Sequence, residues 1–259
     1  MRPTIDLQER VAIVTGGGMG LGLAIAHELA RAGAHLAVLE LDEETSAAAA
    51  DELARAHGVK AISLPADVSD RAAVDAAFAR VAKELGRLDI LVNNAGISRI
   101  GPHTEAVTDE DWQDTIDVMQ TGVFYCMRAA GRLMLPKKRG SVVNVSSIRG
   151  FSPNPGRLAY CAVKAAVIMM TKVAAGEWTA DGVRVNAVAP GVQRTPMWDA
   201  DVAAGVLDES RYLDLVPARR LGDPAEVGKL VTYLCSDHAS YISGALVTID
   251  GGLTSIPAG

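Results

Sequence analysis

A tyrosine and a lysine four positions apart, Tyr160 and Lys164, have the chemistry of an acid–base pair. In a helix, residues at this spacing lie on one face. At about 4 Å and an effective dielectric of about 20, the ammonium would stabilise a phenolate by roughly 4 kcal/mol and lower the phenol pKa toward neutrality. Tyr160 could then exchange a proton with a substrate. An isolated pair of this kind is more often a pair of surface neighbours, so other motifs must support the assignment.

A glycine-rich segment, Thr15 to Gly22, directly follows the aliphatic run Val11 to Val14 and precedes a helical pattern. This order of strand, turn and helix is the one that dinucleotide sites require. Glycines let the backbone approach a pyrophosphate, whose charge is met by free N–H groups and the positive end of the helix. A sharp turn without a ligand is the alternative. The predicted cofactor-binding residues here are Gly16, Gly18, Gly20, Leu21 and Gly22.

An acidic residue, Glu40, ends the second aliphatic run about twenty residues after this turn. A carboxylate there accepts hydrogen bonds from the adenosine ribose and repels a 2′-phosphate. The turn offers Met19 and no Lys or Arg to hold such a phosphate. We therefore predict NAD as the cofactor in preference to NADP, the alternative being a solvated acid at a strand end.

The elements that must position these residues follow an alternating pattern. Seven short aliphatic runs predict strands buried on both faces, at 11–14, 36–39, 61–64, 90–92, 142–145, 183–188 and 246–249. Helical spacing predicts helices at 23–32, 43–57, 72–85, 109–135 and 160–179. The expected fold class is α/β, a Rossmann-type doubly wound domain with a seven-stranded parallel sheet flanked by helices.

Length and composition bound the function classes. The chain has 259 residues, 49% of them hydrophobic, and is expected to form a single domain over residues 1–259. A net charge of −6 argues against nucleic acid as a partner. No signal peptide and no run of eighteen apolar residues is found, so we expect a cytoplasmic protein without a membrane partner. Three scattered cysteines, Cys126, Cys161 and Cys235, indicate no metal site.

Residues 195–220 are weakly periodic, and a substrate loop, with the character of a mobile lid, is expected at about 192–220.

Several further motifs share the order and spacing of one known family. They are Asp67-Val68, Asn93-Asn-Ala-Gly96, Ser147 thirteen residues before Tyr160, Asn186 with Pro190-Gly191 and Thr195, and Asp250-Gly-Gly252. Over Leu7 to Gly252 the sequence resembles a short-chain dehydrogenase/reductase. The resemblance implies an enzyme, usually a homotetramer, that transfers a hydride between a nicotinamide dinucleotide and a secondary alcohol or ketone.

The resemblance also implies roles for matched residues. Tyr160 would exchange the proton with the reacting oxygen, Lys164 would lower its pKa and hold the nicotinamide ribose, and Ser147 would hydrogen-bond the reacting oxygen. The other cofactor-binding residues would be Asp67 and Val68 at the adenine, Asn94 and Gly96 along the cofactor, and Pro190, Gly191, Gln193 and Thr195 at the carboxamide. Asn93 and Asn186 are interpreted as structural.

Two positions depart from the family pattern. The segment Val118-Met119-Gln120 has methionine where similar proteins carry an asparagine that holds a water linked to the lysine. Methionine holds a water poorly, so a rerouted proton path is predicted, and Gln120 could substitute only through a changed register or a local bulge. Gln193 replaces the usual Val or Ile; its backbone contact can persist, while its longer polar side chain could face the substrate.

Candidate substrate residues lie in loops beside the matched catalytic positions: Ser98, Arg149, Asn154 and Arg157. The arginines favour an anionic or polyhydroxylated substrate, such as a sugar, polyol or hydroxy-acid derivative. The alternative is that they pair with Asp199, Asp201, Asp208, Glu209 and Asp214.

Two alternative functions stay open beside an NAD-dependent alcohol dehydrogenase. One is a 3-oxoacyl or other ketone reductase of the same family. The other, for which Met119 is the only sequence argument, is a non-catalytic NAD-binding sensor or scaffold.

Overall fold

A computed structural model describes residues 5–97, 101–205 and 207–255. Its strands form one parallel sheet of seven strands in the order β3-β2-β1-β4-β5-β6-β7. Their bounds are β1 Val11–Thr15, β2 His35–Glu40, β3 Ala61–Pro65, β4 Ile90–Asn93, β5 Gly140–Val145, β6 Val183–Pro190 and β7 Leu246–Ile249. The predicted α/β class and all seven predicted strands are confirmed.

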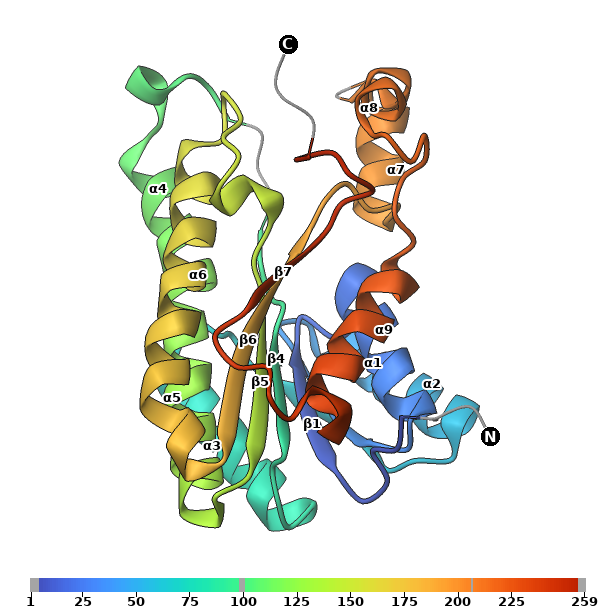
Figure 1. Ribbon diagram of the computed structural model, residues 1–259, viewed down its shortest axis with the longest axis vertical. Helices are drawn as coiled ribbons and strands as arrows, with labels where there is room; N and C mark the ends of the chain where they lie inside the picture. The colour runs from blue at the N-terminus through green and yellow to red at the C-terminus, as the bar shows by residue number, and fades with distance from the viewer. Residues whose placement is uncertain (1–4, 98–100, 206, 256–259) are drawn as a thin grey trace.

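Helices cover both faces of this sheet (Figure 1). On one side lie α1, α2 and α9, and on the other α3, α4, α5 and α6. The helices are α1 Gly20–Arg31, α2 Glu43–His57, α3 Arg71–Glu84, α4 Asp109–Ile116, α5 Gly122–Met134, α6 Leu158–Trp178, α7 Pro196–Ala203, α8 Glu209–Leu215 and α9 Pro224–Cys235. The short 3₁₀ turn η4, Ile148–Gly150, follows β5.

Two apolar cores result from this layering. Alternate residues of each strand face opposite sides, as in β1, where Ile13 contributes to one core and Val14 to the other. Because both faces are covered, the strands are apolar throughout, which is why the sequence shows continuous aliphatic runs.

Two differences from the predicted elements concern the helices. The helix expected over 109–135 contains a π-helical turn at Asp117–Thr121, which separates α4 from α5. The segment expected as a substrate loop at about 192–220 forms two short helices, α7 and α8, both capped by side chains at their N-termini. Helices α7 and α8 bury few residues, so their hydrophobic periodicity is weak and sequence patterning missed them. It also missed α9.

One helical segment, Leu158–Asp181, is long and apolar enough to cross a membrane by length and composition. In the fold it packs along β6 and contributes Val163, Val167 and Ala174 to the buried interior. It is thus a core helix of the sheet, although Met169 and Val173 on its outer face are more than half exposed.

Asparagine side chains tie neighbouring strands together inside this sheet. Asn93 donates to Asn144 across β4 and β5 at 2.8 Å. Asn186 of β6 donates to the carbonyl of Ile242 and accepts from the amide of Ala245, just before β7. The structural interpretation of Asn93 and Asn186 agrees with these contacts.

Candidate active site

The glycine-rich turn between β1 and α1 is packed so closely that side chains are excluded at Gly16 and Gly22. Gly16 has a φ of +60°, in the left-handed region that favours glycine. A Cβ on Gly22 would lie 1.9 Å from the carbonyl oxygen of Gly16. Gly20, with φ of +54°, begins α1 and has open space beside it. The N-terminus of α1 therefore faces an open cleft across bare backbone, which is the cradle that a pyrophosphate needs.

Glu40 lies at the end of β2 beside this turn. Its Oε2 accepts from the Gly18 amide at 3.1 Å, and its Oε1 accepts from the Leu41 amide at 2.9 Å. Glu40 thus braces the turn and lines the cleft at the same time. No Lys or Arg is among the described residues that line this end of the cleft.

Asn94 connects the turn to the next strand. Its side-chain amide donates to the carbonyl oxygens of Thr15 and Gly16, each at 3.0 Å. Asp67, after β3, accepts from the amide and hydroxyl of Ser69. Both residues line the cleft, and these hydrogen bonds hold them in place there.

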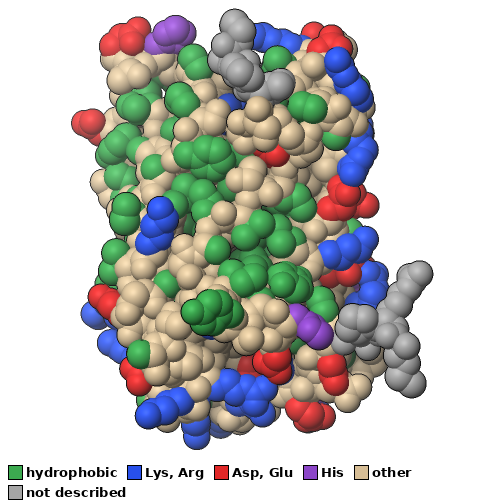
Figure 2. Space-filling model, viewed as in Figure 1, with side chains coloured by type: hydrophobic (Ala, Val, Ile, Leu, Met, Phe, Trp, Pro, Cys, Tyr) green, Lys and Arg blue, Asp and Glu red, His purple; other side chains and the backbone are tan. Residues whose placement is uncertain are grey.

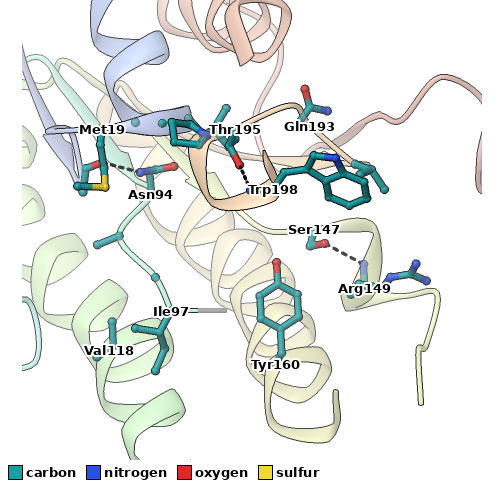
Figure 3. Close-up of a pocket in the computed structure, with 18 of the residues that line it drawn as sticks. Met19, Asn94, Ile97, Val118, Ser147, Arg149, Tyr160, Gln193, Thr195 and Trp198 are labelled. Carbon is teal, nitrogen blue, oxygen red and sulfur yellow. Dashed lines mark hydrogen bonds between the residues drawn. The ribbon is translucent and has the colours of Figure 1, made fainter. Parts of the chain in front are cut away.

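Ser147, Tyr160 and Lys164 come together where β5 ends and α6 begins. Ser147 is held by η4, since its Oγ accepts from the Arg149 amide at 3.1 Å. Tyr160 and Lys164 lie one turn apart on α6, as the spacing predicted, with the Lys164 Nζ 5.7 Å from the Tyr160 ring centroid. Ser147 lies opposite the Tyr160 hydroxyl in the cleft (Figure 3).

The electrostatics of Tyr160 differ from the sequence-based expectation. Burial raises the pKa of Tyr160 above its ordinary value, while the Ser147 side chain and the charges of Arg157 and Arg149 oppose that rise. Lys164 donates to the Val145 carbonyl at 2.8 Å, and burial lowers its pKa to about 8. The lowering of the phenol pKa that the sequence predicts from Lys164 is not seen in the protein alone: burial is the largest cause of the shift, and the charges that oppose it are those of Arg157 and Arg149.

Met119 faces the same cavity as this lysine. It lies in the π-helical turn, is 2% exposed, and lines a cavity of about 180 Å³ together with Tyr160 and Lys164. A Cβ on Gly96 would lie 3.1 Å from the Met119 Cε. A local bulge is thus present, but Gln120 is not among the described residues that line either cavity of the site. Met119, and not Gln120, therefore lines the cavity that Lys164 also lines.

The main cleft has a volume of about 610 Å³ and runs from the glycine-rich turn to η4. Nearly all predicted site residues line it: Gly16, Gly20, Leu21, Gly22, Glu40, Asp67, Val68, Asn94, Gly96, Ser147, Arg149, Asn154, Arg157, Tyr160, Gly191, Gln193 and Thr195. Lys164 and Pro190 line the adjoining smaller cavity. Gly18 lines neither and acts through its bond to Glu40. Ser98 lies outside the described residues.

Several residues of α7 and α8 also line the cleft and were not predicted. The Trp198 and Tyr212 rings meet edge to face at 5.0 Å, and Trp198 donates to Glu209. Thr195, a predicted cofactor residue, caps α7 by accepting from the Trp198 amide. No local pattern in this segment signals that its aromatic residues face the site; only the packing of α7 on α8 brings them there.

Gln193 is packed against the backbone of Gly222. A Cβ on Gly222 would lie 2.3 Å from the Gln193 Oε1, and that oxygen is buried and has no hydrogen-bond partner among the described residues. In Figure 3 its carboxamide points away from Tyr160. The expectation that this side chain faces the substrate is therefore not met in this conformation.

Comparisons with known proteins agree with this geometry. A family model described as Enoyl-(Acyl carrier protein) reductase matches residues 16–254. The oxidoreductase UcpA of Salmonella typhimurium is 40% identical over 256 residues, covering 96% of this chain and 95% of that protein. The 3-oxoacyl-[acyl-carrier-protein] reductase FabG of Staphylococcus aureus is 38% identical over 244 residues, covering 93% and 97%.

Solved structures give the same result. A Sinorhizobium meliloti protein provisionally assigned as a short-chain alcohol dehydrogenase superposes with a TM-score of 0.91 at 37% identity, covering 98% of this chain and 100% of that one. NAD⁺-bound xylitol dehydrogenase superposes with a TM-score of 0.90 at 31% identity, covering 95% and 99%. With its parallel sheet, glycine-rich turn and Ser-Tyr-Lys arrangement, the chain belongs to the short-chain dehydrogenase/reductase family of oxidoreductases.

Proposed function

We propose that the protein is an NAD-dependent dehydrogenase that interconverts a hydrophilic secondary alcohol and its ketone. The observation that carries the proposal is the single cleft that joins Glu40 at one end to Ser147 and Tyr160 at the other. A dinucleotide lying along it would have its adenosine ribose at Glu40 and its nicotinamide beside Tyr160.

The preference for NAD is supported by the charge at the adenosine end. Glu40 offers a carboxylate to the ribose hydroxyls, and the residues around it, Met19 and Leu41, carry no charge that could hold a 2′-phosphate. A phosphate dianion at that point would meet like-charge repulsion. The xylitol dehydrogenase that resembles this chain was solved with NAD⁺ bound.

The chemical step assigns a role to each residue of the trio. Bound NAD⁺ supplies the acceptor for the hydride that leaves the carbinol carbon. Tyr160 acts in its ionised form: its phenolate accepts the hydroxyl proton as the ketone forms, and Ser147 hydrogen-bonds the same oxygen, which fixes the carbinol next to the cofactor. Lys164, buried and held by the Val145 carbonyl, presents its remaining N–H donors to the smaller cavity, where the nicotinamide ribose would lie.

The proposed substrate is a sugar, polyol or hydroxy-acid derivative. Its support is the polar lining near Tyr160, where Arg149, Asn154 and Arg157 face the cleft. A 3-oxoacyl or other ketone reductase is a second candidate, because the FabG relative is 38% identical over nearly its whole length.

Initial rates test these assignments. NAD and NADP are each offered with polyols, sugars, hydroxy acids and simple secondary alcohols near pH 9, and NADH with 3-oxoacyl thioesters near pH 7. Selective NADH formation from hydrophilic alcohols supports the proposal, whereas efficient reduction of the thioesters alone favours the reductase. NAD binding without turnover of any compound, unchanged by Tyr160→Phe, would identify a sensor or scaffold.

We further propose that the chain assembles as a homotetramer. An apolar groove on the outer face of α5 and α6 is lined by Phe124, Met169 and Val173, which are 46%, 59% and 53% exposed. Figure 2 shows hydrophobic side chains gathered over the middle of the face viewed there. An exposed apolar surface of this kind fits a contact between copies of the chain.

A further inference from the structure

Two arginines line the catalytic end of the cleft. Arg149 lies in η4, two residues after Ser147, and Arg157 precedes α6, three residues before Tyr160. Both side chains are half-buried and line the same cleft as Ser147 and Tyr160. The Arg157 guanidinium lies 5.7 Å from the Tyr160 ring centroid. Their charges are close enough to oppose the rise in the pKa of the Tyr160 phenol.

The acidic residues of α7 and α8 do not neutralise Arg149. Asp199 and Glu209 pair with Arg194, and Asp214 pairs with Arg219. Arg149 itself contacts the carbonyl oxygens of Ser152 and Pro153, both at 3.5 Å. In the part of the chain that the structure describes, no carboxylate forms an ion pair with Arg149. The alternative in which the acidic segment absorbs this charge is therefore wrong for Arg149.

The start of α6 adds to the positive potential. Arg157 is the N-cap of this 21-residue helix, and its first turn, all of it described, contains no acidic residue. A cation at a helix N-terminus is unfavourable, because the helix dipole is positive there. Such a local conflict is typical of a functional position, and a bound anion would relieve it. Asp201 of α7 also lines the cleft.

We propose that the substrate of this dehydrogenase carries an anionic group, a carboxylate or a phosphate, which Arg149 and Arg157 bind while the carbinol lies against Ser147 and Tyr160. The inference rests on the proposed function and narrows its substrate class to acids. Guanidinium groups suit this task because their planar N–H donors match carboxylate and phosphate oxygens in pairs.

The test measures binding independently of turnover. Hydroxy acids of three to six carbons, each paired with its own carboxamide, are titrated into the protein–NADH complex, and NADH fluorescence gives Kd. NADH blocks oxidation, so each hydroxy acid forms a dead-end complex. Glycerol 3-phosphate is compared with glycerol in the same way, so that binding of a phosphate is distinguished from binding of a carboxylate. We expect at least one acid to bind about tenfold or more tightly than its neutral partner.

Variants assign that preference to the arginines. Arg149→Gln and Arg157→Gln should each weaken binding of the acid by about tenfold and leave binding of the amide and of NADH unchanged. Arg55→Gln is the matched control, since Arg55 of α2 is exposed and contacts only the Asp51 carbonyl oxygen among the hydrogen bonds of the structure. Asp201→Asn, which removes the opposing charge, should tighten acid binding.

The outcomes separate the two proposals. Equal binding of acids and amides, or an equal loss of both in Arg149→Gln, overturns the anion site. If neutral alcohols are oxidised with NAD while acids show no advantage, the dehydrogenase stands and the anion site falls. If NADH does not bind, or no alcohol is turned over in a Tyr160-dependent manner, the proposed function itself is refuted.

Discussion

Replacing Glu40 by glutamine isolates the part that charge plays in cofactor choice. The carboxylate accepts from the Gly18 amide at 3.1 Å and from the Leu41 amide at 2.9 Å. A glutamine carbonyl can accept the Gly18 bond, so the turn should keep its shape, while the glutamine NH2 group cannot replace the bond from Leu41. The variant therefore removes a negative charge while retaining the brace. An alanine variant would confound the two effects.

The expected magnitude follows from the location of Glu40 on the cleft wall. A 2′-phosphate about 5 Å from the carboxylate, at an effective dielectric of about 20, is repelled by ~3 kcal/mol per unit of phosphate charge, or about a hundredfold in affinity. Exposure to solvent reduces this figure. A hydrogen bond to a charged group exceeds a neutral one by about 1 kcal/mol, so the KM for NAD should rise about fivefold.

The assay compares kcat/KM for NAD and NADP on one substrate, in wild type and in Glu40→Gln. We expect the NAD preference to fall by about ten- to a hundredfold, mostly through improved use of NADP. Low and high salt provide a second readout, because screening should weaken the wild-type discrimination and leave the variant unaffected. An unchanged NAD to NADP ratio in the glutamine variant would refute the electrostatic argument.

Four further predictions concern other residues. Tyr160→Phe should lower kcat by about 10²- to 10⁴-fold while NAD binding, followed by calorimetry, is retained; near-normal turnover would show that another group carries the proton. Met119→Asn places an amide beside Lys164, and solvent isotope effects on kcat should change as the proton path changes; complete loss of turnover would instead show a positive role for the thioether. Met169→Glu puts a charge into the groove between α5 and α6, so light scattering should report a smaller species, and a monomeric wild type would contradict the proposed assembly. Burial and the nearby His27 lower the pKa of His57, so protonation disfavours the folded state, and thermal stability should fall as pH drops below about 6.5, less so in His57→Gln.

The sequence by itself determined the strands, the glycine-rich turn, and the order of the motifs along the chain. Each of these is a local property: strands buried on both faces must be apolar throughout, and a bare turn before a helix must be glycine. The Tyr160–Lys164 spacing is also local, since a helix fixes which residues share a face. Asn93 and Asn186, polar residues in or next to aliphatic runs, could likewise be interpreted as links between strands.

The features that only the tertiary structure decided depend on contacts between distant segments of the chain. The pKa of Tyr160 rises because the surrounding fold desolvates it, and spacing along a helix carries no measure of burial. Helices α7 and α8 bring Trp198 and Tyr212 to the cleft by packing on each other, without an apolar stripe of their own. The partners of Arg149 were open in the sequence because Arg194 and Arg219 compete for the same carboxylates, and only their positions in space settle which pairs form.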